Sequence, residues 1–210
     1  ELNINRLLSV GIEFVHGDIR KAEDLDVAED IDLIIDAAAE PSVLAGLNGG
    51  TEYLYETNLT GTFNILNLAV KKKSKVIFLS TSRIYPIQNI LDSKIEETET
   101  RFQFAEESGV HGISSKGISE ELNLLGARTI YGTTKLSSEL LMKEYESAFG
   151  VDFIINRCGV IAGPHQMGKI DQGFVVLWLA RHYWKKDLSY IGFGGLGKQA
   201  RDIIHVDDLS

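Results

Sequence analysis

The chain has 210 residues, of which 44% are hydrophobic and 24% are charged, a composition that suits one globular domain or slightly more. Its net charge of -9 and its pI near 5.1 argue against a nucleic-acid partner, because phosphate binding requires clustered lysine and arginine. The single cysteine, Cys158, excludes an internal disulfide and a cysteine-based zinc site, which fits a reducing compartment. His16 and His111 have no metal-binding partners at a suitable spacing, so we expect no metal site. No apolar run reaches the roughly 20 residues of a membrane span, and we therefore expect a cytoplasmic protein with no membrane partner.

Hydrophobic periodicity predicts short strands that alternate with amphipathic helices along the chain. Residues 1–10 indicate a helix, and residues 11–18 indicate a strand that ends in a turn. Three further segments carry nearly continuous apolar runs, as in strands buried on both faces; they are 32–39, 75–81 and 151–157. Such alternation indicates an α/β fold with a parallel sheet.

Two amphipathic helices are expected between the last three strands, each with one apolar stripe. The stripes consist of Leu59, Phe63, Leu66 and Val70 in the first helix and of Leu136, Leu140 and Leu141 in the second. Residues 86–128 interrupt the pattern with charges, serines and glycines, so we predict an insertion over the carboxyl edge of the sheet. Ligands bind at that edge in open α/β sheets.

Tyr131 and Lys135 lie four residues apart in a predicted helix, so their side chains share one face. An ammonium group beside a phenol favours the phenolate and moves a group of ordinary pKa near ~10 toward neutrality. A tyrosine tuned in this way can remove a proton from a sugar hydroxyl while a hydride leaves the same carbon. The same spacing also occurs in solvated helix pairs, so the neighbouring motifs have to decide between the two interpretations.

Polar or small side chains lie at the ends of three predicted strands. Asp18 follows the first strand, Ala37–Ala39 end the second, and the hydroxyls of Ser80, Thr81 and Ser82 end the third. A carboxylate can accept a hydrogen bond from an adenine amino group, and small side chains let a cofactor approach the backbone. Each residue also has an ordinary explanation in turns and helix caps, but together, at successive strand ends, they favour a ligand site.

The chain resembles the extended short-chain dehydrogenases/reductases of the NAD-dependent epimerase/dehydratase family. Seven motifs carry the resemblance in the family's order, namely His16–Arg20, Asp36–Ala39, Asn58–Thr62, Leu79–Tyr85, Tyr131–Lys135, Gly163–Pro164 and Arg201–Asp208. Within the family, three segments are most similar to the CDP-paratose (CDP-tyvelose) 2-epimerases, namely Ala37–Val43, Asn156–Val160 and Gly194–Asp202. The resemblance implies an α/β fold with a partial Rossmann-type doubly wound parallel sheet and the start of a small substrate-binding domain. It also implies NAD as the cofactor, a nucleotide sugar as the substrate, and a homo-oligomer built through the helices that bear Tyr131 and Asn58.

The resemblance also implies roles for individual residues. Tyr131 would be the acid/base, Lys135 would hold the nicotinamide ribose and tune the tyrosine, and Thr81 would bond the reacting hydroxyl. The implied cofactor contacts are Asp18 and Ile19 at adenine, Ala37 and Ala38 along the phosphates and ribose, Asn58 behind Lys135, and the backbone near Cys158 at the nicotinamide. The implied substrate contacts are Ser82, Arg83 and Arg201, of which Arg201 would clamp the diphosphate with its planar guanidinium.

The implied activity is a nucleotide-sugar epimerase that passes through a transient keto-sugar, with 2-epimerisation of a CDP-sugar favoured. A 4,6-dehydratase usually carries Asp-Glu after the threonine matched by Thr81, whereas this chain has Ser82 and Arg83. Many sugar 4-epimerases have Tyr-Phe-Asn after the arginine, where this chain has Cys158–Val160. An alternative of another class is a catalytically silent NAD-binding regulator, although such proteins typically lose the tyrosine or the lysine.

The family's glycine-rich phosphate loop follows its first strand, and this chain opens after that point. Gly-x-Gly-x-x-Gly occurs only at Gly192–Gly197, where substrate-binding loops are expected, and we interpret it as coincidental. We expect residues 1–162 to form a partial NAD-binding Rossmann domain without its first two strands, with the insertion 86–128 over the active site. Residues 163–210 would begin the substrate-binding portion. We therefore expect the sequence to be an internal fragment of a longer enzyme, which by itself binds NAD weakly and converts no substrate.

Overall fold

The computed structural model describes residues 2–27, 29–46, 49–168, 172–191 and 193–210. The chain divides into two compact units that are not consecutive in sequence. The first unit comprises Glu1–Thr81 and Thr129–Cys158, and the second comprises Ser82–Arg128 and Gly159–Ser210.

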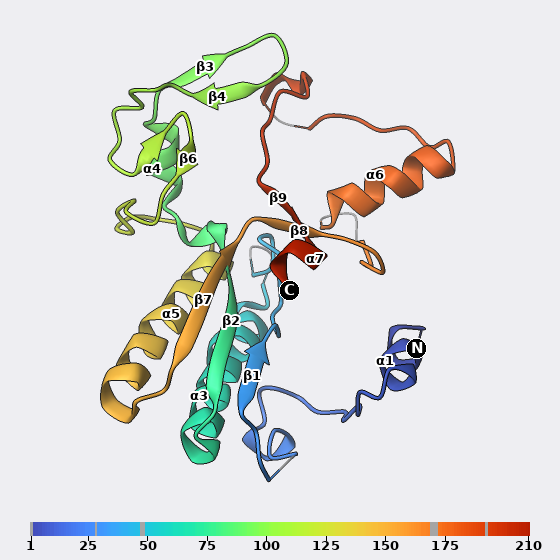
Figure 1. Cartoon of the computed structure of the whole chain (residues 1–210). Coiled ribbons are helices and arrows are strands. Elements are labelled where there is room, and N and C mark those ends of the chain that lie inside the picture. The colour runs from blue at the N-terminus through green and yellow to red at the C-terminus, as the bar shows by residue number, and fades with distance from the viewer. Residues whose placement is uncertain (1, 28, 47–48, 169–171, 192) are drawn as a thin grey trace. The chain divides into compact units, whose positions relative to one another are not determined.

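The first unit is built on a three-stranded parallel sheet in the order β1-β2-β7 (Figure 1). The strands are β1 (Leu33–Asp36), β2 (Lys75–Thr81) and β7 (Phe153–Cys158). Three of the four predicted strands are thereby confirmed, and each falls within or close to its apolar run. Alternate side chains of β2 are buried, because every second residue points to the same face.

Helices α3 (Gly61–Lys72) and α5 (Ile130–Phe149) pack side by side against this sheet (Figure 1). Helix α5 begins where the Thr129 hydroxyl accepts a hydrogen bond from Gly132 N and ends at Gly150 in the left-handed conformation. The core between helices and sheet consists of Ile65, Leu66, Ala69, Val76, Phe78, Met142, Tyr145 and Val151. This arrangement confirms the predicted α/β class with a parallel sheet.

Before α3, the described residues form α1 (Leu2–Ser9), a 3-10 turn η1 (Ala22–Asp24) and α2 (Thr51–Tyr55). A π-helical turn, η2 (Glu56–Thr60), joins α2 to α3 without interruption. Helix α1 confirms the helix predicted over residues 1–10.

The predicted apolar stripes are only partly the buried faces of the two helices. Leu66 is fully buried, but Phe63 is 43% exposed and Leu140 is 57% exposed. The buried face of α5 is instead largely polar, because it carries Lys135, Ser138 and Glu139 against the strand ends. A hydrophobic-period prediction cannot identify such a face, since it scores these three residues as solvent-facing.

The strand predicted over residues 11–18 is wrong, because no strand is assigned to residues 12–18. Strand order β1-β2-β7 makes β1 an edge strand, and 12–18 form no ladder with it. A strand is stabilised by a hydrogen-bonded neighbour, and none of the described residues supplies one for this segment. The predicted turn after it is present, since Lys21 N donates to Asp18 O at 2.9 Å.

The second unit contains short, mostly paired segments (Figure 1). Residues 86–128, predicted as an irregular insertion, include α4 (Ile87–Leu91) and two antiparallel strand pairs. The pairs are β3 (Ile95–Glu97) with β4 (Phe102–Phe104), and β5 (Ile113–Ser114) with β6 (Gly117–Ile118). Phe102 N donates to Lys198 O at 2.7 Å, so the β3–β4 hairpin is joined to the C-terminal part of this unit.

The rest of the second unit follows β7. Strand β8 (Val160–Ala162) pairs in parallel with β9 (Ile203–His205). The other elements after β7 are α6 (Phe174–Tyr183), η4 (Phe193–Gly195) and α7 (Val206–Leu209), while the 3-10 turn η3 (Ser82–Ile84) directly follows β2. Because β8 pairs with β9, residues 159–162 group with the second unit, whereas the sequence placed the domain boundary after residue 162.

The pattern Gly192–Gly197 lies in this second unit, and Gly192 itself is outside the described residues. Phe193–Gly195 form the 3-10 turn η4, and no helix follows over 196–202. The segment therefore differs from a strand–turn–helix phosphate loop. None of the helices among the described residues is long and apolar enough to cross a membrane.

Candidate active site

The first turns of α5 bring Tyr131 and Lys135 to the buried face of the helix. Tyr131 is buried, and Lys135 is only 2% exposed. The cap at Thr129 sets where the helix starts, and four-residue spacing then places both side chains on one face. The predicted pair is therefore brought together on one element and enclosed by the first unit.

Lys135 lies among both apolar and acidic groups. Its Nζ is 4.0 Å from the centroid of the Phe78 ring, a cation–π geometry. Burial lowers the pKa of Lys135 to about 8, while the negative charges of Asp36, Glu139 and Cys158 act in the opposite direction. A lysine held this way changes its charge near neutral pH, which is typical of functional sites.

Asn58 lies in the π-helical turn η2, and it is fully buried. Its side chain accepts from Glu40 N at 2.7 Å and donates to Glu40 O at 3.1 Å and to Thr134 Oγ1 at 3.2 Å. Its carbonyl accepts from Ser138 Oγ at 3.2 Å. Asn58 thus connects the segment after β1 to helix α5. Because π-helical turns are rare and occur often at functional sites, η2 favours a functional role for this position.

The carboxyl ends of β2 and β7 carry the next two predicted residues. Thr81 and Cys158 are register partners, so they lie opposite each other on neighbouring strands. Thr81 is buried and Cys158 is half-buried. This edge is where parallel sheets place their ligands, and the structure brings both residues into the unit that holds Lys135.

A polar cluster beneath this edge was missed by the sequence reasoning. Glu139, buried on α5, accepts from Ser80 Oγ at 2.5 Å and from Arg157 Nη2 at 2.8 Å. The usable signal was present, because Glu139 follows Lys135 by one helical turn and Arg157 ends a predicted strand. The pairing itself joins three elements and is visible only in the folded chain.

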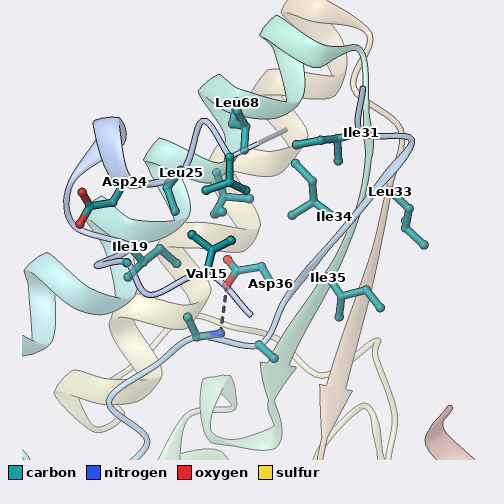
Figure 2. Close-up of a pocket in the computed structure, with 15 residues that line it drawn as sticks. Val15, Ile19, Asp24, Leu25, Ile31, Leu33, Ile34, Ile35, Asp36 and Leu68 are labelled. Carbon is teal, nitrogen blue, oxygen red and sulfur yellow. Dashed lines mark hydrogen bonds between the residues drawn. The ribbon is translucent and has the colours of Figure 1, made fainter. Parts of the chain in front are cut away.

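A cavity of about 420 Å³ lies between β1, α3 and the segment before β1 (Figure 2). Its walls are mostly apolar, and it includes three predicted cofactor residues, Ile19, Ala37 and Ala38. Asp36, to which no role was assigned, also lines it and is buried; Asp36 Oδ2 accepts from Thr62 Oγ1 at 2.9 Å and Oδ1 accepts from Ala38 N at 3.2 Å. Burial raises the pKa of Asp36, opposed by the nearby Lys135 charge.

Asp18 and Ile19 lie beside this cavity at the turn before η1. Asp18 pairs with Arg20, whose Nη2 lies 2.6 Å from Asp18 Oδ2, and hydrogen bonding from Arg20 lowers the pKa of Asp18 to about 2. The carboxylate is therefore an acceptor at all ordinary pH values. Ile19 packs against Gly61, where an added Cβ would lie 2.8 Å from Ile19 Cγ2.

The predicted substrate residues Ser82, Arg83 and Arg201 belong to the second unit. Partial desolvation lowers the pKa of Arg201, and the positive charge of Arg83 lowers it further. Two guanidinium groups that influence each other in this way favour an anion near them. Among the described residues, no group of three His, Cys, Asp or Glu side chains is arranged to hold a metal ion.

Comparison with known proteins identifies a family that covers nearly the whole chain. The NAD-dependent epimerase/dehydratase family matches residues 2–210. CDP-paratose 2-epimerase of Salmonella typhi is 27% identical over 215 residues, covering 99% of this chain and 60% of that protein.

Two solved structures are also similar. A double mutant of a dTDP-glucose 4,6-dehydratase from Streptomyces venezuelae, with NAD bound, has a TM-score of 0.70 at 26% identity, covering 99% of this chain and 55% of its own. The UDP-glucuronic acid 4-epimerase of Bacillus cereus, in complex with UDP-glucuronic acid and NAD, has a TM-score of 0.69 at 25% identity, with coverages of 99% and 57%. The chain thus spans somewhat more than half the length of these relatives.

Proposed function

The chain belongs to the NAD-dependent epimerase/dehydratase family, and we propose that the protein is an NAD-dependent nucleotide-sugar epimerase, most like a CDP-sugar 2-epimerase. The observation that carries the proposal is the enclosure of Lys135 on one face of α5 with Tyr131, in the unit that holds Thr81 and Cys158 at adjacent strand ends. Similarity to CDP-paratose 2-epimerase of Salmonella typhi supports the narrower choice.

The residues present fit two parts of NAD. The cavity beside Ala37 and Ala38 offers small side chains, the apolar Ile19 wall and the nearby Asp18 acceptor, which suit an adenine ring and its amino group. At the other end, the buried ammonium of Lys135 suits the ribose hydroxyls of the nicotinamide half. Bound NAD would supply the acceptor and the donor of the hydride.

The side chains of the chain would then handle the proton. Tyr131 would take the proton of the reacting sugar hydroxyl and return it after the sugar has turned. Lys135 would stabilise the phenolate by its charge, and Thr81 would orient the hydroxyl. Asn58, held by Glu40 and Thr134, would keep η2 and α5 in place behind Lys135.

The pair Arg83 and Arg201 would bind the diphosphate of the nucleotide sugar. Both belong to the second unit, and the charge of one influences the other. A diphosphate accepts bidentate hydrogen bonds from guanidinium groups, which gives orientation as well as affinity. Ser82, which precedes Arg83, would contribute a hydroxyl to the same substrate.

The test is conversion of CDP-sugars, UDP-sugars and dTDP-sugars by the protein that contains these 210 residues, followed by NMR of the product. We expect inversion at carbon 2 of a CDP-sugar, and a substrate deuterated at that carbon should give a product that keeps the deuterium. Tyr131→Phe should lower kcat at least a hundredfold, whereas Tyr183→Phe, an exposed tyrosine of the second unit, should not. Inversion at carbon 4 would instead identify a 4-epimerase, and a product lighter by one water would identify a 4,6-dehydratase. NAD binding without turnover of any sugar would support the regulator alternative.

A further inference from the structure

Glu139 is a buried carboxylate with no part in the proposed proton transfer. It lies one turn after Lys135 on the same face of α5, and it is 1% exposed. A buried charge is costly unless it is paired and hydrogen-bonded. Its position beside the predicted catalytic pair therefore calls for a physical explanation.

The Glu139 carboxylate connects α5 to the carboxyl ends of two strands. Ser80 of β2 donates its hydroxyl to Oε1 at 2.5 Å. Arg157 of β7 donates from Nη2 to Oε2 at 2.8 Å and from Nε to Oε2 at 3.2 Å and Oε1 at 3.3 Å. A forked guanidinium–carboxylate pair of this kind restricts direction as well as distance.

The partners of Glu139 are the immediate neighbours of two predicted site residues. Ser80 precedes Thr81, Arg157 precedes Cys158, and these two pairs are in register across β2 and β7. The carboxylate thus holds the strand ends next to Thr81 and Cys158 against the helix that bears Lys135. Any slip of α5 along the sheet would break the ion pair and leave the buried Glu139 charge without its partner.

Glu139 also acts on Lys135 through its charge. The groups whose charges act on Lys135 are Asp36 from β1, Glu139 from α5 and Cys158 from β7, and all three raise the lysine pKa against the effect of burial. Loss of the Glu139 charge should therefore lower the pKa of Lys135 below its present value near 8.

We propose that Glu139 is a positioning residue, which fixes Lys135 relative to Thr81 and Cys158 by joining α5 to Ser80 and Arg157. The expected effect on turnover rests on the proposed function. The geometry of the Glu139–Arg157 ion pair does not depend on which substrate is bound. The Glu139 carboxylate is engaged by Ser80 and Arg157, so we assign it no direct role in the reaction.

The test compares Glu139→Gln with Glu144→Gln in the protein that contains these 210 residues. Glu144 is exposed on the same helix, so it controls for the chemical change. We expect Glu139→Gln to lower kcat at least tenfold with less than a threefold change in KM, and to move the alkaline limb of the pH–rate profile to lower pH. Ser80→Ala keeps the charge, so it should lower kcat without moving that limb. Equal kcat and equal pH profiles for Glu139→Gln and Glu144→Gln would overturn the proposal.

A second measurement does not require turnover, and a second variant is available if Glu139→Gln does not fold. Side-chain NMR of ¹³C-labelled lysine should show Lys135 titrating at lower pH in Glu139→Gln than in Glu144→Gln. If no nucleotide sugar is converted by the wild type, the proposed function fails while this titration still decides the role of Glu139. If Glu139→Gln does not fold, Ser80→Ala decides it; this variant keeps the charge, so the Lys135 pKa should stay unchanged while kcat and the side-chain chemical shifts of Lys135 change. A wild-type kcat or, in the absence of turnover, wild-type chemical shifts of Lys135 in Ser80→Ala would overturn the proposal.

Discussion

At the scale of single residues, Lys135 is the most informative group in the chain. Its spacing from Tyr131 is visible in the sequence, but its burial is a property of the fold. Burial lowers its pKa from 10.5 to about 8, so the folded protein loses this proton at a lower pH than the unfolded chain does. Between these two values Lys135 binds more protons in the unfolded state, so its contribution to the free energy of unfolding rises with pH.

The lowered pKa of Lys135 predicts how the stability of the protein depends on pH. Lys135→Met removes the titration, so the free energy of unfolding of the wild type should increase relative to that of the variant between pH 8 and 10.5, at up to about 1.4 kcal/mol per pH unit. Below that range the difference should be constant. Chemical denaturation of both proteins at several pH values measures it, in a Tyr131→Phe background, because Lys135 is proposed to tune the ionisation of Tyr131 and the two titrations would otherwise be coupled. If the free energies of unfolding of the two proteins changed with pH in parallel across the whole range, a lowered pKa of Lys135 would be contradicted.

At the scale of elements, the junction of η2 and α3 depends on one close contact. Gly61 begins α3, and a Cβ added there would lie 2.8 Å from Ile19 Cγ2 and 3.1 Å from Ile19 Cγ1. Ile19 is stiff because it is branched at Cβ, and it also lines the cavity of Figure 2. The contact thus links the helix start to a residue predicted to touch adenine.

Gly61→Ala should therefore destabilise the protein by about 1–3 kcal/mol, even though alanine is a better helix former than glycine. The double variant Gly61→Ala with Ile19→Ala should recover part of that loss, because the colliding side chain is shortened. A denaturation-based double-mutant cycle measures the coupling between the two positions. Gly61→Ala alone raising stability by the helix-propensity difference would show that Ile19 moves aside freely.

At the scale of the whole molecule, the outer surface of α3 and α5 carries three exposed large apolar side chains among polar ones. Phe63 packs edge-on against Tyr145 at 6.5 Å between ring centroids, and Tyr145 lies 5.2 Å from Phe149. Phe63, Leu140 and Phe149 are all exposed in the single chain. These exposed residues belong to the two helices for which the family resemblance implied an oligomer interface, so we propose a homo-oligomer that buries this face.

The corresponding prediction is that Leu140→Glu converts the oligomer to monomers in sedimentation equilibrium. A carboxylate buried at position 140 in the proposed interface would be desolvated without a partner. Lys143→Glu, on an exposed position of the same helix, controls for the added negative charge and should leave the oligomer intact. An unchanged mass for Leu140→Glu would place the interface elsewhere.

Features that depend on local residue order could be predicted from the amino-acid sequence. Continuous apolar runs located β1, β2 and β7, and four-residue spacing placed Tyr131 and Lys135 on one helix face. Family motifs then located Thr81 and Cys158 at strand ends that the structure shows in register. Each of these depends on residues within a few positions of one another.

Which polar side chains become buried and which apolar side chains stay exposed depends on contacts between residues far apart in the sequence. Glu139 meets Ser80 and Arg157 because the fold brings together residues 59 and 18 positions away, and no periodicity encodes such a meeting. Hydrophobicity predicts that Leu140 is a core residue, but its side chain is exposed, because Lys135 and Glu139 occupy the buried face of α5. The segment 12–18 has strand-like composition but no strand, since pairing depends on a neighbour in space and not on the residues of the segment alone.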